Sequence, residues 1–158
     1  MKQTTLCYIE QDNKYLMLHR VKKENDINKD KWIGVGGHFE PGETAEDCMK
    51  REILEETGLT ALSYRYRGIV TFHSDIYDSE QMHLFTVEKF EGDIAECDEG
   101  TLEWIDKSKL LSLPMWEGDK IFLKLIADRN QDFFHLTLTY RGDSLAEAIL
   151  NGVALLLS

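Results

Sequence analysis

The chain has 158 residues, of which 42% are hydrophobic and 30% are charged, and both proportions are ordinary for a soluble globular protein. At this length we expect one domain, residues 1–158, with a proper hydrophobic core. The formal net charge of −11 argues against a nucleic-acid polymer or an anionic membrane as a partner. It does not argue against a polyanionic nucleotide whose charge is neutralised locally by metal ions.

The cysteine content points to a reducing compartment. Cys7, Cys48 and Cys97 are an odd set without a C-x-x-C pair, which is typical of cysteines used as small apolar residues. The chain opens with MKQTT and leads straight into a strand-like run, with no signal-peptide pattern. We therefore expect a cytoplasmic protein.

The first forty residues predict strands. Residues 4–10 and 15–21 are strand-like and are separated by the turn-rich stretch 11–14, so they are interpreted as a hairpin. Residues 21–30 are polar and predict a loop. Residues 31–37 (KWIGVGG) are apolar but broken by glycines, which favours a tight strand or bend over a helix.

A helix is expected at residues 45–57. Pro41 and Gly42 mark a turn before it, and Thr44 is placed as its N-cap with Asp47 in a capping-box position. Gly58 stands where a left-handed C-cap belongs.

Strand and helix signals continue to the end of the chain. Strand character is found at 62–73, 81–90, 102–105 and 133–140. A second, amphipathic helix is predicted at 117–128. Its expected inward residues are Ile121, Phe122, Leu125 and Ile126. This order of elements predicts an α+β fold: one mixed sheet with helices packed against it.

The last fifteen residues, 144–158, are unusually apolar for a terminus. The segment is shorter than the roughly 20 residues that span a bilayer, and the absence of basic residues disfavours a membrane-surface role. We expect the core to span about 4–140 and this tail to pack on the domain or on a second subunit, which leaves a homodimer open. Asn151 and Gly152 suggest a turn between two short apolar pieces.

Residues 37–59 (GHFEPGETAEDCMKREILEETGL) carry the strongest functional signal, with the spacing G-x5-E-x7-R-E-U-x-E-E-x-G-U, where U is a bulky aliphatic. The charged and glycine positions of this pattern are Gly37, Glu43, Arg51, Glu52, Glu55, Glu56 and Gly58. Three of the glutamates share an arc roughly 100° wide on one helix face. Like charges this close repel, and a bound cation relieves the repulsion. Hard divalent metals such as Mg²⁺ prefer carboxylate, carbonyl and water oxygens.

This segment resembles the Nudix box, the signature of hydrolases that cleave a diphosphate linked to another moiety, and every fixed position is filled. The alternative is a merely solvated acidic helix. Such a helix needs neither Gly37 nor Gly58. The resemblance implies an α/β/α sandwich, the Nudix fold.

The resemblance also implies which residues bind metal. The metal role falls on Glu52 and Glu56, with Glu55 as a further ligand, and Mg²⁺ is the implied ion, for which Mn²⁺ can substitute. The Gly36 carbonyl would complete the shell. Glu99, in the loop before the next strand, is a candidate ligand from outside the box, and its alternative role is an acidic turn residue.

The catalytic base is either Glu52 or Glu55, and the sequence does not distinguish between them. Arg51 is expected to orient a neighbouring carboxylate rather than to touch substrate, with Glu55 four positions on as its natural partner. Glu43 is expected to support the loop through hydrogen bonds or through Arg51.

Other segments address the substrate. Residues 31–37 and 113–119 resemble corresponding segments of the MutT/MutX-like 8-oxo-dGTP diphosphatase group, in which a tryptophan covers the purine and an aspartate contacts its edge. That resemblance assigns the roles to Trp116 and Asp119, with Phe72 as a second wall of the base site. The aromatic residues could instead be ordinary core. Lys22 and Lys23 are candidates for phosphate contact or simply part of a solvated loop.

Ile33 departs from the pattern, because animal oxidised-purine triphosphatases carry an asparagine there and an aliphatic side chain cannot read a base edge. The leading hypothesis is an Mg²⁺-dependent pyrophosphohydrolase of (oxidised) purine nucleoside triphosphates that cleans the nucleotide pool. The alternatives are the same chemistry on a nucleotide sugar, dinucleotide or coenzyme, or a non-catalytic nucleotide-binding sensor, which would typically lose the box carboxylates.

Overall fold

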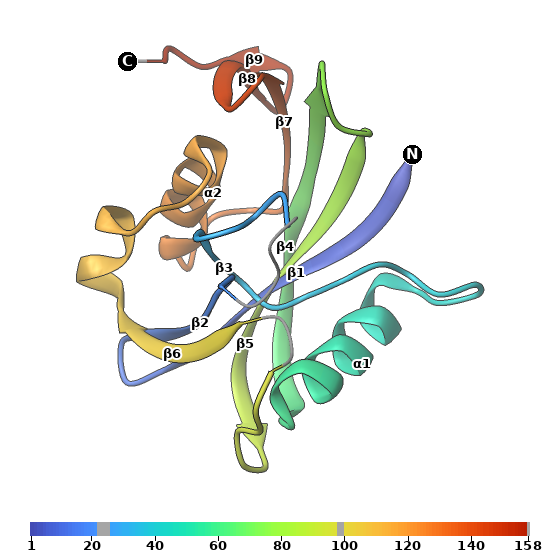
Figure 1. Cartoon of the computed structure of the whole chain (residues 1–158), viewed down its shortest axis with the longest axis vertical. Helices are drawn as coiled ribbons and strands as arrows, with labels where there is room; N and C mark the ends of the chain where they lie inside the picture. Colours follow the sequence, from blue (N-terminus) through green and yellow to red (C-terminus); the bar gives the residue numbers. More distant parts are fainter. Residues whose placement is uncertain (22–25, 98–99, 158) are drawn as a thin grey trace.

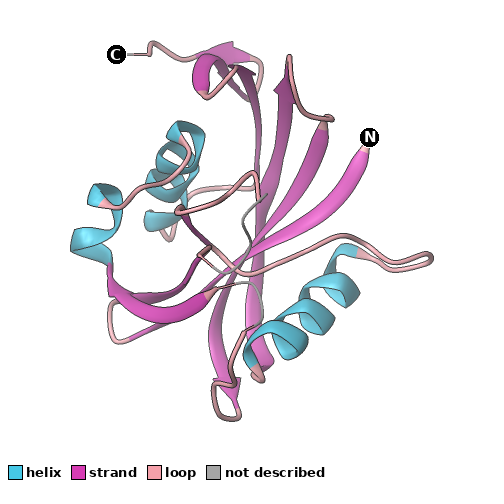
Figure 2. Cartoon of the chain, viewed as in Figure 1, coloured by secondary structure: helices cyan, strands magenta, loops and turns pink. Residues whose placement is uncertain are grey.

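The computed structural model describes residues 1–21, 26–97 and 100–157. In that part of the chain, nine strands form one sheet, and helices α1 (Ala45–Thr57) and α2 (Glu117–Ala127) lie on opposite sides of it (Figures 1 and 2). A short 3-10 helix, η1 (Lys107–Ser112), precedes α2. The arrangement confirms the expected α+β sandwich. The strands are β1 (Lys2–Gln11), β2 (Lys14–His19), β3 (Trp32–Ile33), β4 (Thr60–Ser74), β5 (Glu80–Glu91), β6 (Thr101–Asp106), β7 (Phe134–Arg141), β8 (Ser144–Leu150) and β9 (Val153–Ala154).

The sheet is mixed. Its order is β3-β2-β1-β5-β4-β7-β8-β9, with β6 pairing to β2. The pairs β1·β5 and β4·β7 are parallel, and the others are antiparallel. The hairpin expected between β1 and β2 is confirmed. Asp12 and Asn13 have φ of 52° and 61°, as a tight turn with two left-handed residues requires.

The sheet separates two hydrophobic clusters, and β1 contributes to both. Leu6 and Tyr8 belong to the cluster that packs with α2, whereas Cys7 and Ile9 belong to the cluster that packs with α1. This alternation follows from the two-residue period of a strand, and it buries β1 on both faces. The strand therefore lies between the two hydrophobic clusters and contributes side chains to each of them.

Both ends of α1 agree with the sequence. Thr44 accepts the backbone N–H of Asp47, and the Asp47 carboxylate accepts the backbone N–H of Thr44, so the capping box is complete. Gly58 has φ +81° and donates its N–H to the carbonyl of Leu54. The helix boundaries are thus set by local chemistry.

The buried face of α2 differs in part from the expected one. Phe122 and Ile126 are buried as expected, but Leu123 is buried as well, while Ile121 and Leu125 are only partly buried.

The apolar segment after residue 140 is part of the sheet. β8 pairs with β7, and β9 pairs back onto β8 around the turn at Asn151 and Gly152. Ala148 is fully buried in the α2-side cluster, so the core extends past the limit of about 140 that we expected. In the described ranges no helix is long and apolar enough to cross a membrane.

Candidate active site

The turn before α1 lies directly on β1. Val35 exchanges both backbone hydrogen bonds with Cys7, and Thr5 donates its N–H to the carbonyl of Gly37. A Cβ on Gly36 would stand 1.9 Å from the Thr5 carbonyl oxygen, and one on Gly37 would stand 2.5 Å from the carboxyl carbon of Glu52. Any side chain at either position would displace the turn from the strand or push the glutamate away.

The same turn faces two glutamates of α1. The N–H of Gly36 donates to Glu56 Oε2 at 3.2 Å, while the Glu52 carboxylate touches Gly37. In an extended segment the N–H and C=O of one residue point to the same side. Because both groups of Val35 point to β1, the Gly36 carbonyl points toward α1 with its N–H. Backbone and carboxylate oxygens therefore gather at one place.

Arg51 organises the surrounding acidic side chains. Its Nε and Nη2 bind the two carboxylate oxygens of Glu43 at 2.7 and 2.8 Å. Its Nη1 donates to Glu52 at 2.8 Å and to Glu55 at 3.2 Å, and Nη2 also donates to the His38 carbonyl at 3.0 Å. The guanidinium thus ties the turn to the helix, with Glu43 as its bidentate partner.

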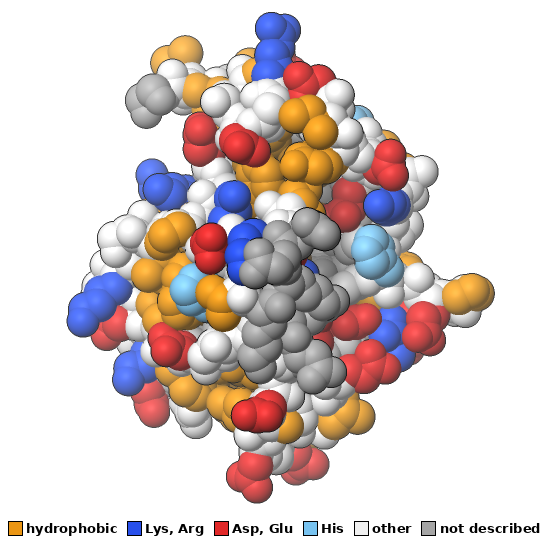
Figure 3. Space-filling view, in the orientation of Figure 1, with side chains coloured by type: hydrophobic (Ala, Val, Ile, Leu, Met, Phe, Trp, Pro, Cys, Tyr) orange, Lys and Arg blue, Asp and Glu red, His pale blue; other side chains and the backbone are white. Residues whose placement is uncertain are grey.

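These ion pairs change the titration of the groups involved. The Arg51 hydrogen bonds, with the backbone N–H of Glu40, lower the pKa of Glu43 to about 2. The same contacts raise the pKa of Arg51. Over α1, at the right of Figure 3, red acidic side chains surround blue basic ones. The structure brings Arg51 together with the carboxylates that it is expected to orient, and its hydrogen bond to Glu52 is shorter than that to Glu55.

The donor set at the turn suits a hard divalent cation. The Glu52 side chain is 14% exposed and that of Glu55 is 58% exposed, while Glu56 lies against Gly36. Within the described residues no three His, Cys, Asp or Glu side chains are already gathered around one metal position. The fit therefore rests on the chemistry and placement of the oxygens: two carboxylates and a backbone carbonyl, which match the ligands of Mg²⁺.

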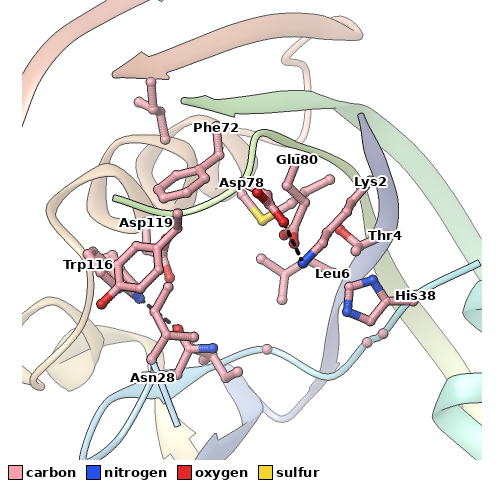
Figure 4. A pocket seen from close by; sticks show the side chains of 18 of the residues that line it. Lys2, Thr4, Leu6, Asn28, His38, Phe72, Asp78, Glu80, Trp116 and Asp119 are labelled. Atoms are coloured by element: carbon pink, nitrogen blue, oxygen red, sulfur yellow. Dashed lines mark hydrogen bonds and ion pairs between the residues drawn. The ribbon is translucent and has the colours of Figure 1, made fainter. Parts of the chain in front are cut away.

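A cavity of about 540 Å³ opens beside this turn. Gly36, Gly37 and His38 line it at the box, and Phe72, Trp116 and Asp119 line it farther away (Figure 4). In Figure 4 Trp116 and Asp119 lie at one end, whereas Lys2, Thr4 and His38 lie at the other. The cavity thus runs from the glycine turn, which contacts Glu52 and Glu56, to the residues predicted to contact a base.

Trp116 is held firmly at its end of the cavity. Its indole Nε1 donates to Asn28 Oδ1 at 2.7 Å, and the Lys31 ammonium lies 4.5 Å from the ring centroid. Phe72 and Tyr140 contact it edge to face. Trp116 is only 9% exposed and belongs to the hydrophobic core, and it also lines the cavity.

Asp119 is a buried carboxyl that faces the cavity. Its exposed fraction is 7%, and no described residue donates a hydrogen bond to its side chain. Burial raises the pKa of Asp119 to about 7, against the opposing charge of Lys31. Such a shift is typical of a functional group prepared for a ligand.

Some predicted residues lie outside the described part of the chain, namely Lys22, Lys23 and Glu99. Sequence reasoning also missed residues that line the cavity. Lys2 lies at its box end in an ion pair with Asp78 at 3.5 Å, and Asn28 lies at its far end. Neither belongs to a motif, and both reach the site through contacts distant in sequence.

The NUDIX domain model matches residues 2–126, and the chain belongs to this family. The carboxylate site at a glycine turn is thus that of a Nudix hydrolase, an enzyme of phosphoanhydride bonds. Members of the family generally use divalent metal ions and act on nucleotides.

Individual relatives cover most of the chain. An uncharacterised Nudix hydrolase of Bacillus subtilis, YvcI, is 30% identical and covers 89% of this chain and 87% of its own length. An oxidized purine nucleoside triphosphate hydrolase of Danio rerio is 33% identical, with 82% of each covered. The crystal structure of a mutator MutT protein from Bacillus halodurans has a TM-score of 0.84 at 27% identity, covering 96% of this chain and 98% of its own.

Proposed function

We propose that the protein is an Mg²⁺-dependent pyrophosphohydrolase of purine nucleoside triphosphates, including oxidised ones such as 8-oxo-dGTP, that cleans the cytoplasmic nucleotide pool. The single observation that carries the proposal is one continuous cavity, which is lined at one end by the glycine turn that contacts Glu52 and Glu56 and at the other end by Trp116 and Asp119. The relative from Danio rerio named for oxidised purine nucleotides supports the same substrate class.

Hydrolysis takes place at the box end of the cavity, and the base of the substrate binds at the other end. Water attacks a phosphorus of the triphosphate, the bridging P–O bond breaks, and pyrophosphate leaves the nucleoside monophosphate. Glu52, Glu56, Glu55 and the Gly36 carbonyl would hold Mg²⁺, which would supply charge neutralisation on the phosphates and activation of the attacking water. Glu52 or Glu55 takes the proton of the attacking water, and Arg51 keeps both carboxylates in place.

The base end sets the substrate. A planar base packs against the aromatic wall that Phe72 and Trp116 form together, while Asp119 meets its edge. Lys2 carries positive charge at the box end, where the phosphates would lie. The alternative substrate, a nucleotide sugar, dinucleotide or coenzyme, requires the same box and a different occupant of the cavity.

The deciding experiment measures pyrophosphate and phosphate release from 8-oxo-dGTP, dGTP, a nucleotide sugar and a dinucleotide, with and without Mg²⁺. We expect hydrolysis of the triphosphates only with Mg²⁺, and a loss of about 100-fold or more in kcat in Glu52→Gln. Glu46→Gln, an exposed change on the same helix, is the matched control. Preference for the nucleotide sugar would refute the purine triphosphate assignment, and metal-independent activity would refute the carboxylate mechanism.

A further inference from the structure

Two polar side chains line the Trp116 end of the cavity, where the proposed function puts the base. Asn28 comes from the turn before β3, and Asp119 comes from the first turn of α2. Both line the cavity and both lie next to Trp116 in Figure 4. Ile33 lines the same cavity and offers neither a donor nor an acceptor.

The orientation of the Asn28 amide is set by Trp116. The indole Nε1 donates to Asn28 Oδ1 at 2.7 Å. Because an indole N–H can only donate, the atom that meets it must be the amide oxygen, and the amide cannot turn over without losing the bond. The amide nitrogen is therefore the other end of the group, directed away from the indole (Figure 4). It makes no hydrogen bond to any described residue.

The backbone of Asn28 is held as well. The Asp26 carboxylate accepts its N–H at 3.0 Å, and the Lys31 N–H donates to its carbonyl at 2.9 Å. Arg20 in turn binds the other oxygen of Asp26 at 2.5 Å. A side chain fixed in this way loses little conformational entropy when a ligand binds.

Asp119 supplies the complementary group. No described residue donates to its carboxylate, which is an acceptor when ionised. The end of the cavity that Trp116 lines thus offers an oriented donor from Asn28 and an acceptor from Asp119.

We propose that Asn28, acting with Asp119, is the specificity-determining residue that selects a keto base, a 6-oxopurine, over a 6-aminopurine. The inference rests on the proposed function, because the ligand is the base of the triphosphate. A 6-oxopurine presents an acceptor oxygen at C6 beside an N1–H donor, which matches the two side chains. Adenine presents an amino donor beside an acceptor nitrogen, so donor meets donor and acceptor meets acceptor.

The test compares dITP with dATP, because hypoxanthine and adenine differ only at this edge. Values of kcat/KM for both nucleotides are measured with Mg²⁺ at about pH 8, above the pKa of Asp119. Using one preparation of the whole chain for both substrates makes the ratio independent of the active fraction. We expect wild type to prefer dITP by about tenfold or more.

Asn28→Asp replaces the amide nitrogen with an oxygen and keeps an oxygen for Trp116. The dITP to dATP ratio is expected to fall by about tenfold, because the donor becomes an acceptor that suits the adenine amino group. Asn28→Leu, which has no amide, is expected to bring the ratio close to one. Asn130→Asp makes the same charge change on an exposed loop that does not line the cavity, and it should leave the ratio unchanged.

An unchanged ratio in Asn28→Asp, with wild type hydrolysing both nucleotides, overturns the role of Asn28 and leaves the proposed function intact. A wild-type preference for dATP over dITP also overturns the role of Asn28. Failure of wild type to hydrolyse any purine triphosphate with Mg²⁺ overturns the proposed function itself.

Discussion

Arg51 is the residue on which the geometry of the carboxylate site depends. Its guanidinium contacts Glu43 in bidentate fashion, Glu52 and Glu55 on its own helix, and the backbone of His38 in the turn. The contacts use the planar fork of the group, whose N–H directions a lysine ammonium cannot reproduce. Charge alone is therefore insufficient at this position.

We expect Arg51→Lys to lower kcat by roughly 10–100-fold, because the carboxylates that it orients would no longer be held in place. The loss should be partly recovered at raised Mg²⁺ concentration, since metal binding is weakened. Steady-state kinetics over a Mg²⁺ titration measures both effects. Lys50→Arg on the exposed neighbouring position is the control. Wild-type kinetics in Arg51→Lys would contradict the positioning role.

Asp119 links the base site to stability. The pKa of its carboxyl rises from 3.8 to about 7 on folding because the group is buried. Between these values the folded protein binds more protons than the unfolded chain, so this residue's contribution to the free energy of unfolding falls as pH rises from about 4 to 7. Nearby Lys31 opposes the shift. Burial raises the pKa of Tyr8 and of Tyr140, and the charge of Asp119 adds to both rises.

Asp119→Asn should therefore increase the free energy of unfolding at about pH 8 by roughly 1–3 kcal/mol, and by much less near pH 4. Urea denaturation at several pH values measures the difference. If the free energy of unfolding of the variant and of wild type changed with pH in the same way, the carboxyl would be ionised without penalty in the folded state.

At the scale of elements, the close docking of α2 on β7 builds the base end of the cavity. A Cβ on Gly118 would stand 2.4 Å from Leu138 Cδ1 and 2.7 Å from the Tyr140 hydroxyl. That hydroxyl also accepts the Gly118 N–H at 2.7 Å. Trp116 and Asp119 flank this glycine, so their positions follow from the depth at which the helix is seated.

Gly118→Ala is expected to destabilise the fold by about 1–3 kcal/mol through overpacking, and to raise KM for nucleotides more than it lowers kcat. Thermal unfolding and steady-state kinetics test the two parts. Lys120→Ala, a change in the same helix away from the Tyr140 contact, should affect neither. A fully stable variant with normal KM would mean that the helix can shift without cost.

Local chemistry explains which elements could be predicted. The caps of α1 at Thr44 and Gly58 lie within its own sequence, so its limits followed directly. The pairing of β8 with β7 did not, because a segment rich in Ala, Leu and Glu has no strand signal of its own. The same reason applies to Asn28, whose defining contact with Trp116 spans 88 residues of chain. Sequence resemblance predicted the carboxylates and also Trp116 and Asp119, whereas Asn28 and Lys2 were found only through the tertiary structure.

At the scale of the whole molecule, the final hairpin completes the α2-side core. Ala148 is fully buried there, and Leu155 packs against the same cluster, whereas Leu156 is fully exposed. The last strands are therefore part of the domain, and the residues beyond Leu155 contribute little to its core.

Truncation after Gly142 should prevent stable folding, because it removes β8 and uncovers the apolar face of β7. Truncation after Leu155 should lower the free energy of unfolding by about 1 kcal/mol or less, which leaves the Tm within a few degrees of wild type. Circular dichroism melting curves separate the two. A folded, active chain ending at Gly142 would show that the hairpin is dispensable.

The carboxylate site and the base end of the cavity are built by separate parts of the chain. On the carboxylate side, Arg51 holds the box residues together through its hydrogen bonds to Glu43. The base side consists of the turn that contains Asn28 and the helix that carries Asp119. Residues 33–38 run between the two sides, and Ile33, Gly36, Gly37 and His38 of this segment line the cavity. Substitutions at Asn28 or Asp119 are therefore expected to change the choice of base while the contacts of Arg51 with the carboxylates stay intact, so that the two halves of the site can be redesigned separately.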